Sequence, residues 1–209
     1  MNMSEKILVS LCCIFIGVFC ASGAENIKKT MKMSVFTKYP PQAKTSGTSG
    51  SNLTGVKDQW LDIELKYRPQ DIKDVKKRFI DDVDLNVRVL CRDAKRTVLF
   101  NGSVKYWYIE RDGKDHYMKA LLPAPIFRRY ISDQNIDRFK LYVAADIVVG
   151  GKVIATAYGS NKAVPLKDIS AAFRNLPKNT VKVEGAVSGR TGTTWSIIEV
   201  NKYEYEKVK

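Results

Sequence analysis

The chain has 209 residues, of which 44% are hydrophobic and 27% charged, and its formal net charge is +13 at pH 7. This length is enough for one domain with a packed core. The only histidine is His116, which excludes a metal site built from several histidines. The positive charge favours encounter with anionic partners, although a soluble face rich in lysine would give the same composition.

Residues 1–24 have the pattern of a cleavable signal peptide. Lys6 precedes the apolar run Ile7–Phe19, and small residues follow up to Ala24. The run is too short to span a bilayer comfortably, although an uncleaved anchor is the alternative. We therefore predict cleavage after Ala24 and an exported protein, in the periplasm, at the outer surface or secreted.

The cysteines agree with export into a bacterial envelope. Cys12, Cys13 and Cys20 belong to the leader, and only Cys91 remains after cleavage. The mature chain therefore has no intrachain disulfide, which fits a bacterial envelope better than a eukaryotic secretory product. A lipid anchor on Cys20 is disfavoured because the bulky Phe19 precedes it.

The first part of the mature chain is predicted to hold one strand and a linker. Met31, Met33 and Val35 alternate with polar residues, as in a short strand. Residues 40–51 are rich in Pro, Gly, Ser and Thr and have little to bury. Residues 25–55 are therefore interpreted as an N-terminal strand and flexible linker, and residues 56–209 as the main domain.

Alternating apolar residues predict two long strands at the start of that domain. Trp60–Arg68 places Leu and Ile on one side and charged residues on the other, and Pro69 ends the strand. Asp82–Arg92 has the clearest alternation, with Cys91 on the apolar side. These strands are typical of an antiparallel sheet with one face on a core and one in water.

Two short turn sequences come next. Asn101-Gly102 separates Thr97–Phe100 from Val104–Glu110 and is interpreted either as a type I′ turn or as a bulge within one strand. Asp112-Gly113 is predicted to form a hairpin that joins Tyr106–Glu110 to His116–Leu122.

The second half of the domain continues this pattern with short helices between strands. Ile126–Ile131, after two prolines, is predicted to form a single helical turn, and Leu166–Leu176 a helix that ends before Pro177. Strands are predicted over Phe139–Val149 and Lys152–Tyr158, joined by Gly150-Gly151, and then over Thr180–Val187 and Thr193–Glu206. The fold class is therefore all-β with minor α, an antiparallel β-sandwich with one or two short helices.

Few residues suggest catalysis. His116 follows the Asp112-Gly113 turn, where a solvated histidine is the default and a general base the alternative. The thiol of Cys91 is predicted to be buried and inert rather than nucleophilic. Asp81, Asp82 and Asp84 form an acidic cluster that would suit either ion pairs with nearby Lys and Arg or the carboxylates of a glycosidase.

Two places have the composition of a binding surface. Lys105, Tyr106 and Tyr108 would form an aromatic and basic platform for single-stranded nucleic acid or sugars, with Trp107 on the opposite face, in the core. Arg128 and Arg129 form a second basic spot, although such a pair is also common at a solvated corner.

The strands Trp60–Arg68, Val83–Arg92, Val104–Glu110 and Phe139–Val149 together resemble those of a known group of proteins. The group comprises small secreted immunoglobulin-like proteins of diderm bacteria, which are encoded beside machinery for type IV-like pili. The resemblance covers roughly residue 56 to the C-terminus. It implies an immunoglobulin-like sandwich and a non-enzymatic role in the envelope or with pili, and it offers no catalytic residues.

We therefore predict a non-enzymatic exported binding or scaffold protein of the bacterial envelope, with a pilus association implied by the resemblance. We expect no cofactor and no metal. The expected partner is a protein of an envelope or pilus assembly, and a homo-oligomer is a further candidate. The alternatives are a binder of nucleic acid, acidic glycans or anionic membrane surfaces and, ranked last, a carboxylate-based hydrolase.

Overall fold

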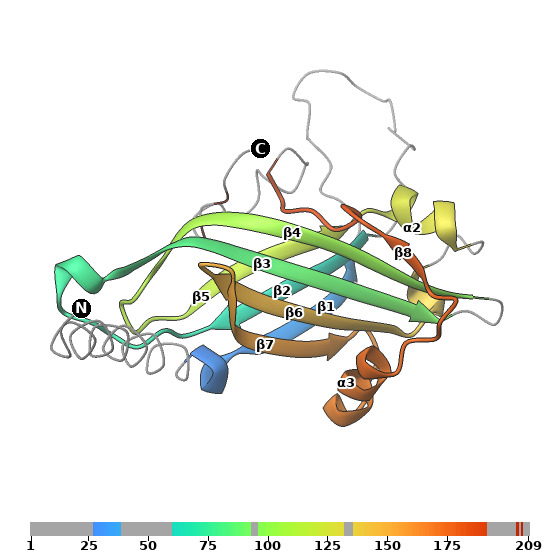
Figure 1. Cartoon of the computed structure of the whole chain (residues 1–209), viewed down its shortest axis with the longest axis horizontal. Helices are drawn as coiled ribbons and strands as arrows, with labels where there is room; N and C mark the ends of the chain where they lie inside the picture. Colours follow the sequence, from blue (N-terminus) through green and yellow to red (C-terminus); the bar gives the residue numbers. More distant parts are fainter. Residues whose placement is uncertain are drawn as a thin grey trace, which may run out of the picture.

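The computed structural model describes residues 27–38, 60–92, 96–131 and 136–191, together with Glu204 and Glu206. These residues form two β-sheets that pack face to face, with two short α-helices at one end (Figure 1). The fold class is all-β with minor α, as predicted. The leader, most of the linker and most of the strand predicted over Thr193–Glu206 lie outside the described residues.

The smaller sheet has three antiparallel strands in the order β1-β2-β5. They are β1 (Lys32–Lys38), β2 (Trp60–Tyr67) and β5 (His116–Leu122). The predicted first strand pairs with β2 along its whole length, from Lys32 opposite Lys66 to Lys38 opposite Trp60. It is therefore an integral edge strand of this sheet.

The larger sheet has five strands in the order β7-β6-β3-β4-β8. They are β3 (Phe79–Arg92), β4 (Thr97–Glu110), β6 (Leu141–Val149), β7 (Lys152–Ser160) and β8 (Val181–Val183). β8 has only three residues and runs parallel to β4. The purely antiparallel sandwich predicted from the sequence is therefore wrong in this one strand, and the larger sheet is mixed.

The core lies between the two sheets and is built from the alternating apolar residues. Leu61, Ile63 and Leu65 of β2 are fully buried, and they face the buried residues Val83 to Cys91 of β3. Cys91 is a free thiol in this core, as predicted. Burying each such aliphatic side chain contributes about 1.5–3 kcal/mol, so this alternation is the main source of the fold's stability.

Two α-helices and two 3-10 helices, with a helical turn at residues 27–30, complete the described structure. The α-helices are α2 (Ala124–Tyr130) and α3 (Leu166–Arg174), each preceded by a proline. The 3-10 helices are η1 (Val75–Lys77) and η2 (Ile136–Arg138). α2 inserts Phe127 into the core, whereas α3 covers part of the outer face of the larger sheet. Neither α-helix of the described residues has the length and apolar character needed to cross a membrane.

Asn101 and Gly102 form neither a turn nor a bulge, because β4 passes through them in unbroken register with β3. Another segment explains the glycine: a Cβ on Gly102 would lie 1.9 Å from the carbonyl oxygen of Val187. The Asn101 carbonyl accepts hydrogen bonds from the N–H groups of Ala186 and Val187. The sequence pair therefore marks a close crossing of two backbones.

The Asp112-Gly113 turn joins strands of different sheets, because β4 lies in the larger sheet and β5 in the smaller one. The turn itself is tight, with Gly113 at φ 71°. The predicted hairpin is therefore wrong, although the turn is in the predicted place. The Gly150-Gly151 hairpin between β6 and β7 is confirmed, with both glycines at positive φ.

The free edge of β5 is covered by three different partners. The Tyr117 carbonyl accepts from the N–H of Glu204, and Leu121 exchanges both backbone hydrogen bonds with Ser188. Between them, the Tyr106 hydroxyl contacts both the N–H and the carbonyl of Lys119 at 3.0 Å. We call this region, where residues 186–191 with Glu204 and Glu206 lie between β4 and β5, the C-terminal seam.

Candidate functional site

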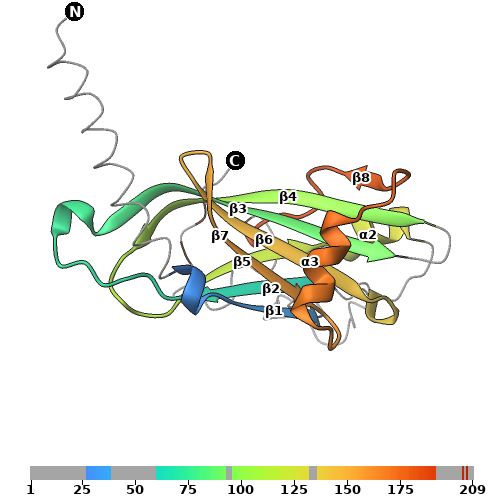
Figure 2. The same cartoon turned by 60° about the horizontal axis from the view of Figure 1, so that its bottom comes forward.

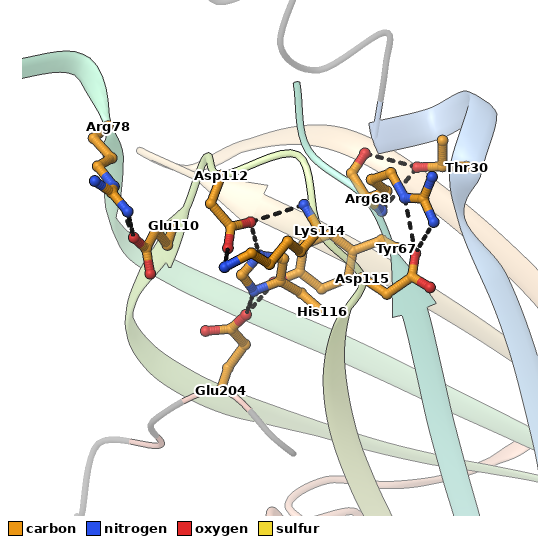
Figure 3. A network of polar contacts seen from close by, with 10 residues as sticks. All are labelled: Thr30, Tyr67, Arg68, Arg78, Glu110, Asp112, Lys114, Asp115, His116 and Glu204. Carbon is orange, nitrogen blue, oxygen red and sulfur yellow. Dashed lines mark hydrogen bonds and ion pairs between the residues drawn. The ribbon is translucent and has the colours of Figure 1, made fainter. Parts of the chain in front are cut away.

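The most elaborate polar arrangement surrounds His116, at the end of the sandwich that carries the 111–115 turn (Figure 3). The Nδ1 atom of His116 lies 2.5 Å from Glu204 Oε1, and its Nε2 atom lies 2.7 Å from Asp112 Oδ1. The Tyr67 hydroxyl donates to the same Glu204 oxygen at 3.0 Å, and the Tyr67 ring stacks on the imidazole. His116 is therefore held between two carboxylates and an aromatic ring, and the predicted solvated position is wrong.

Three separate parts of the chain supply this arrangement. Tyr67 ends β2, His116 begins β5, and Glu204 comes from the C-terminal seam. Asp112 belongs to the turn, where its carboxylate also accepts from the N–H of Lys114 at 2.9 Å. The four side chains thus link the turn between the two sheets to the C-terminal seam.

The carboxylates stabilise the charged form of the imidazole. Burial by itself would lower the pKa of His116, but the hydrogen bonds to Glu204 and Asp112 outweigh it and raise the pKa above its ordinary value. Burial would likewise raise the pKa of Asp112, but the hydrogen bonds from His116 and Lys114 lower it to about 2. Burial and the neighbouring Glu204 raise the pKa of the Tyr67 hydroxyl well above 10.

This geometry suits a structural role better than proton transfer. A general base needs a free nitrogen within reach of a substrate proton. In His116, each ring nitrogen already has a carboxylate partner, and the side chain is mostly buried. The arrangement acts instead as a link that fixes the C-terminal seam to the turn and to β2.

Further ion pairs surround the same end of the molecule. Asp115 pairs with both Lys66 and Arg68, at 2.5 and 2.8 Å, and Arg78 pairs with Glu110. Arg68 is also tied to the N-terminal region, because its N–H and carbonyl both bond the Thr30 hydroxyl. We call this part of the sandwich the turn end; it comprises residues 66–78 and 110–116 together with Glu204.

The opposite end carries α2 and α3 and has a different charge balance. We call it the helix end, and it comprises residues 124–131, 136–141 and 162–184. Its acidic residues are Asp137, Asp168 and Glu184. Its basic residues are Arg128, Arg129, Arg138, Lys140, Lys162, Lys167, Arg174, Lys178 and Lys182.

The aromatic platform predicted on β4 is assembled from different residues than expected. Tyr106 is fully buried, and its hydroxyl bonds the backbone of β5, so it does not belong to a surface site. Trp107 was expected in the core but is 57% exposed. Lys105 is exposed beside it, and Tyr108 is half-buried and packs edge-on against Phe79 at 5.1 Å.

Of the other predicted residues, Arg128 and Arg129 lie apart from this platform, whereas Asp84 lies beside it. Arg128 and Arg129 are in the last turn of α2 at the helix end, with Arg129 fully exposed. Asp84 lies opposite Lys105 in the register of β3 and β4, and Asp82 has a left-handed backbone with φ 51°. The structure therefore does not bring the predicted binding residues together into one site.

A buried ion pair lies on the smaller sheet. Asp62 of β2 and Lys119 of β5 are both almost fully buried, and their charged groups are 3.1 Å apart. Strand alternation predicts Asp62 on the solvent side, so this pair is not expected from the sequence pattern. In the described parts of the chain, no group of three or more His, Cys, Asp or Glu side chains has the geometry to hold a metal ion.

Comparison with known proteins assigns the chain to a family. One family model matches residues 21–209, which is nearly the whole sequence. The chain belongs to this family. No curated protein matches the chain significantly.

Solved structures show that the fold of this family member has been seen before. A crystal structure from Akkermansia muciniphila is similar over 86% of this chain and 92% of its own, with 14% sequence identity and a TM-score of 0.62. The sporulation control protein Spo0M of Bacillus subtilis matches over 70% of this chain and 55% of its own, with 11% identity and a TM-score of 0.29. The first of these similarities shows a shared fold.

Proposed function

We propose that this family member is a non-enzymatic, exported binding or scaffold protein of the bacterial envelope that takes part in a pilus assembly. The observation that carries the non-enzymatic part is the environment of its only histidine. Both nitrogens of His116 are engaged by carboxylates in a link between chain segments. A residue used in this way supports the fold rather than a reaction.

Family membership and fold support the remainder of the proposal. The chain resembles secreted immunoglobulin-like proteins encoded beside type IV-like pilus machinery, and its fold is that of the Akkermansia muciniphila structure over most of both chains. The signal-peptide pattern of residues 1–24 supports export. An immunoglobulin-like sandwich commonly acts through its faces, end loops and strand edges, which suits a binding or scaffold role.

The sheet edges indicate where a protein partner would add a strand. β5 is covered along the C-terminal seam, so the outermost strands that remain are β1, β7 and the three-residue β8. β1 and β7 contact each other where Gly159 meets Met33 and Val35. Phe36 on β1 and Val153 on β7 are both exposed apolar residues. Strand addition at such an edge forms backbone hydrogen bonds, while exposed apolar side chains provide selectivity.

The test is in-cell photo-cross-linking in the producing bacterium. A photoreactive residue at Phe36 or Val153 should cross-link to an identified pilin or pilus-assembly component, and the same residue at Lys178 on the helix end should not. The mature protein should begin at Glu25 and occur in the envelope fraction. An intact Met1, or edge positions that cross-link to no envelope or pilus protein, would contradict the proposal.

A second candidate function, binding of a polyanion, is favoured by the charge of the helix end. Basic residues of α2, α3 and their flanking segments far outnumber acidic ones there. Affinity for a polyanion that displaces counterions falls steeply with salt. Binding of the mature protein to heparin or duplex DNA across ionic strength tests it, because a partner retained at high salt would favour the assembly function instead.

A further inference from the structure

Among the described residues, α3 covers the outer face of the larger sheet at the helix end (Figure 2). There, Leu90 and Leu99 pack against Ala172 of α3. Arg88 marks the border of this contact, because its guanidinium lies 5.4 Å from the ring of Phe173. Beyond Arg88, toward the turn end, most outward-facing residues of four neighbouring strands are partly or fully exposed, although Val148 of β6 is buried.

We call this area the open face. Strand pairing places its residues side by side on neighbouring strands. Asn86 lies between Asp146 of β6 and Ser103 of β4, and Asp84 lies between Val148 and Lys105. The next outward residue of β4 is Trp107, which is 57% exposed. The distance from Ser103 to Trp107 is four residues, or about 13 Å of strand.

Part of this face is already held in place by hydrogen bonds. Arg88 Nη2 donates to Asp146 Oδ2 at 2.9 Å, and Thr156 Oγ1 donates to Asp146 Oδ1 at 2.7 Å. These bonds fix the Asp146 carboxylate beside Asn86. A site that is ordered before binding loses less conformational entropy when a ligand arrives.

The charge of the open face differs from that of the protein as a whole. The chain carries +13, yet the carboxylates of Asp84 and Asp146 lie on this face. Asp82 also lies nearby, between Asp81 and Val83, which pair with Tyr108 and Tyr106 on either side of Trp107. Lys105 and Arg88 offset them only in part. A phosphate or sulfate polymer stacked on Trp107 would therefore approach carboxylates at short range, which is unfavourable.

The remaining chemistry matches an uncharged sugar chain. One face of a pyranose ring consists of C–H groups that pack on an aromatic ring, whose face carries negative charge density. The hydroxyl and amide groups at the rim of the sugar exchange hydrogen bonds with short polar side chains such as Asn, Asp and Ser. The open face provides both kinds of group in one plane.

We propose that the open face is a glycan-binding site for a neutral oligosaccharide or polysaccharide, with Trp107 as the stacking platform and Asp84, Asn86 and Ser103 as hydrogen-bonding groups. This site is independent of the pilus proposal, because it uses a sheet face and no strand edge. It adjoins the basic helix end at Arg88 but differs from it in charge, so the two surfaces suit ligands of different charge.

The test uses the mature protein with three probes: a tetramer of N-acetylglucosamine, a tetramer of β-linked glucose, and heparin as the anionic comparison. We expect at least one neutral tetramer to bind with a dissociation constant of about 1 mM or tighter. Its binding should shift the Trp107 indole N–H resonance, assigned through the Trp107→Phe variant, and should change little with salt.

Variants separate this site from general surface adhesion. Trp107→Ala should weaken the neutral sugar about tenfold or more, whereas Trp107→Tyr should keep most of the affinity. Phe79→Ala removes another exposed aromatic, 44% exposed and outside the open face, and should leave affinity unchanged. If neither tetramer binds, or if Trp107→Ala and Phe79→Ala bind equally well with intact folding, the proposal is overturned.

Discussion

The two ends of the sandwich are stabilised by different forces. At the turn end, the described residues form a dense set of ion pairs around Asp115, Glu110 and His116. At the helix end, aromatic rings pack together, with Phe127 against Phe100 and Phe139. One end therefore pairs its charged groups with one another, and the other combines an apolar interior with a basic surface.

This difference indicates which properties of each end are structural. Buried aromatic contacts are worth several kcal/mol, whereas exposed ion pairs contribute little unless they form a network or are buried. The charge at the helix end is therefore available for recognition without much cost in stability. At the turn end, charged groups contribute to the stability of the fold through the partly buried contacts of His116.

The largest expected effect concerns the apolar packing of the helix end. Phe127→Ala should destabilise the protein by about 3–5 kcal/mol, because it removes a fully buried ring that touches two others. Urea unfolding of the mature protein measures this. Arg129→Ala on the exposed side of α2 is the control, with an expected change within about 0.5 kcal/mol. Equal losses for both variants would contradict the comparison.

At the turn end, the largest effect should come from Glu204. Glu204→Gln should destabilise by about 1–3 kcal/mol, because it removes a charge that His116 and Tyr67 both contact in a buried place. Glu184→Gln, at an exposed carboxylate that accepts from Asn101, is the matched control and should change stability much less. The same urea measurement applies, and a reversed order would show that the link is not structural.

The dependence of stability on pH tests the same link through His116. The folded pKa of His116 is raised, so its contribution is fully present below the unfolded pKa of about 6.5 and is lost as pH rises through the folded pKa. The folded pKa of Asp112 is lowered to about 2, so its contribution is present above the unfolded pKa and is lost as pH falls toward 2.

We therefore expect stability to fall on both sides of a maximum near weakly acidic to neutral pH. His116→Gln should remove the alkaline part of this fall, which thermal unfolding across pH would show. An alkaline slope that persists unchanged in His116→Gln would assign it to another group.

Cys91 provides a smaller test of the core. Cys91→Ala should cost about 1 kcal/mol or somewhat more through a small cavity, because the thiol is fully buried. In the folded protein, this thiol should react with a thiol reagent far more slowly than in the unfolded chain. Equal reaction rates would show that the assignment of strand faces is wrong.

The smallest effect on stability is expected from the basic surface. Reversing Arg128 and Arg129 to Glu should leave stability nearly unchanged but slow association with an acidic partner such as heparin, most strongly at low salt. The matched reversal of Lys73 and Lys76 at the turn end should slow association less, because Asp71 and Asp74 lie close to those lysines in the chain. An association rate that changes neither with salt nor with the reversal of Arg128 and Arg129 would contradict a recognition role for this charge.

Much of the fold could be predicted from alternation alone. The strands β2, β3, β6 and β7 and the helix α3 lie within a few residues of their predicted bounds. Local patterns suffice there because each strand has one face on the core and a turn sequence at its end. They do not tell which sheet a strand joins, so Asp112-Gly113 was taken for a hairpin.

The candidate sites were less predictable, because they depend on contacts between distant segments. Trp107 is exposed because β4 alternates with Val104 and Tyr106 buried, whereas Ile109 is buried because the alternation changes phase after Tyr106. The change lies near Asp82, whose left-handed backbone is uncommon for a residue other than Gly. His116 gains its second carboxylate from Glu204, which is 88 residues away. The only local sign of this link was Asp112, four residues before His116.

The C-terminal seam also sets an order for folding. The hydrogen bonds that finish β5 come from Ser188 and Glu204, and the Glu206 carboxylate accepts from the N–H groups of Arg190 and Thr191. Hairpins such as β6–β7 form from neighbouring residues, but these contacts join segments far apart in sequence and form slowly. A growing chain therefore cannot close its sandwich until residue 206 has been synthesised, and until then the β5 edge remains open to other chains.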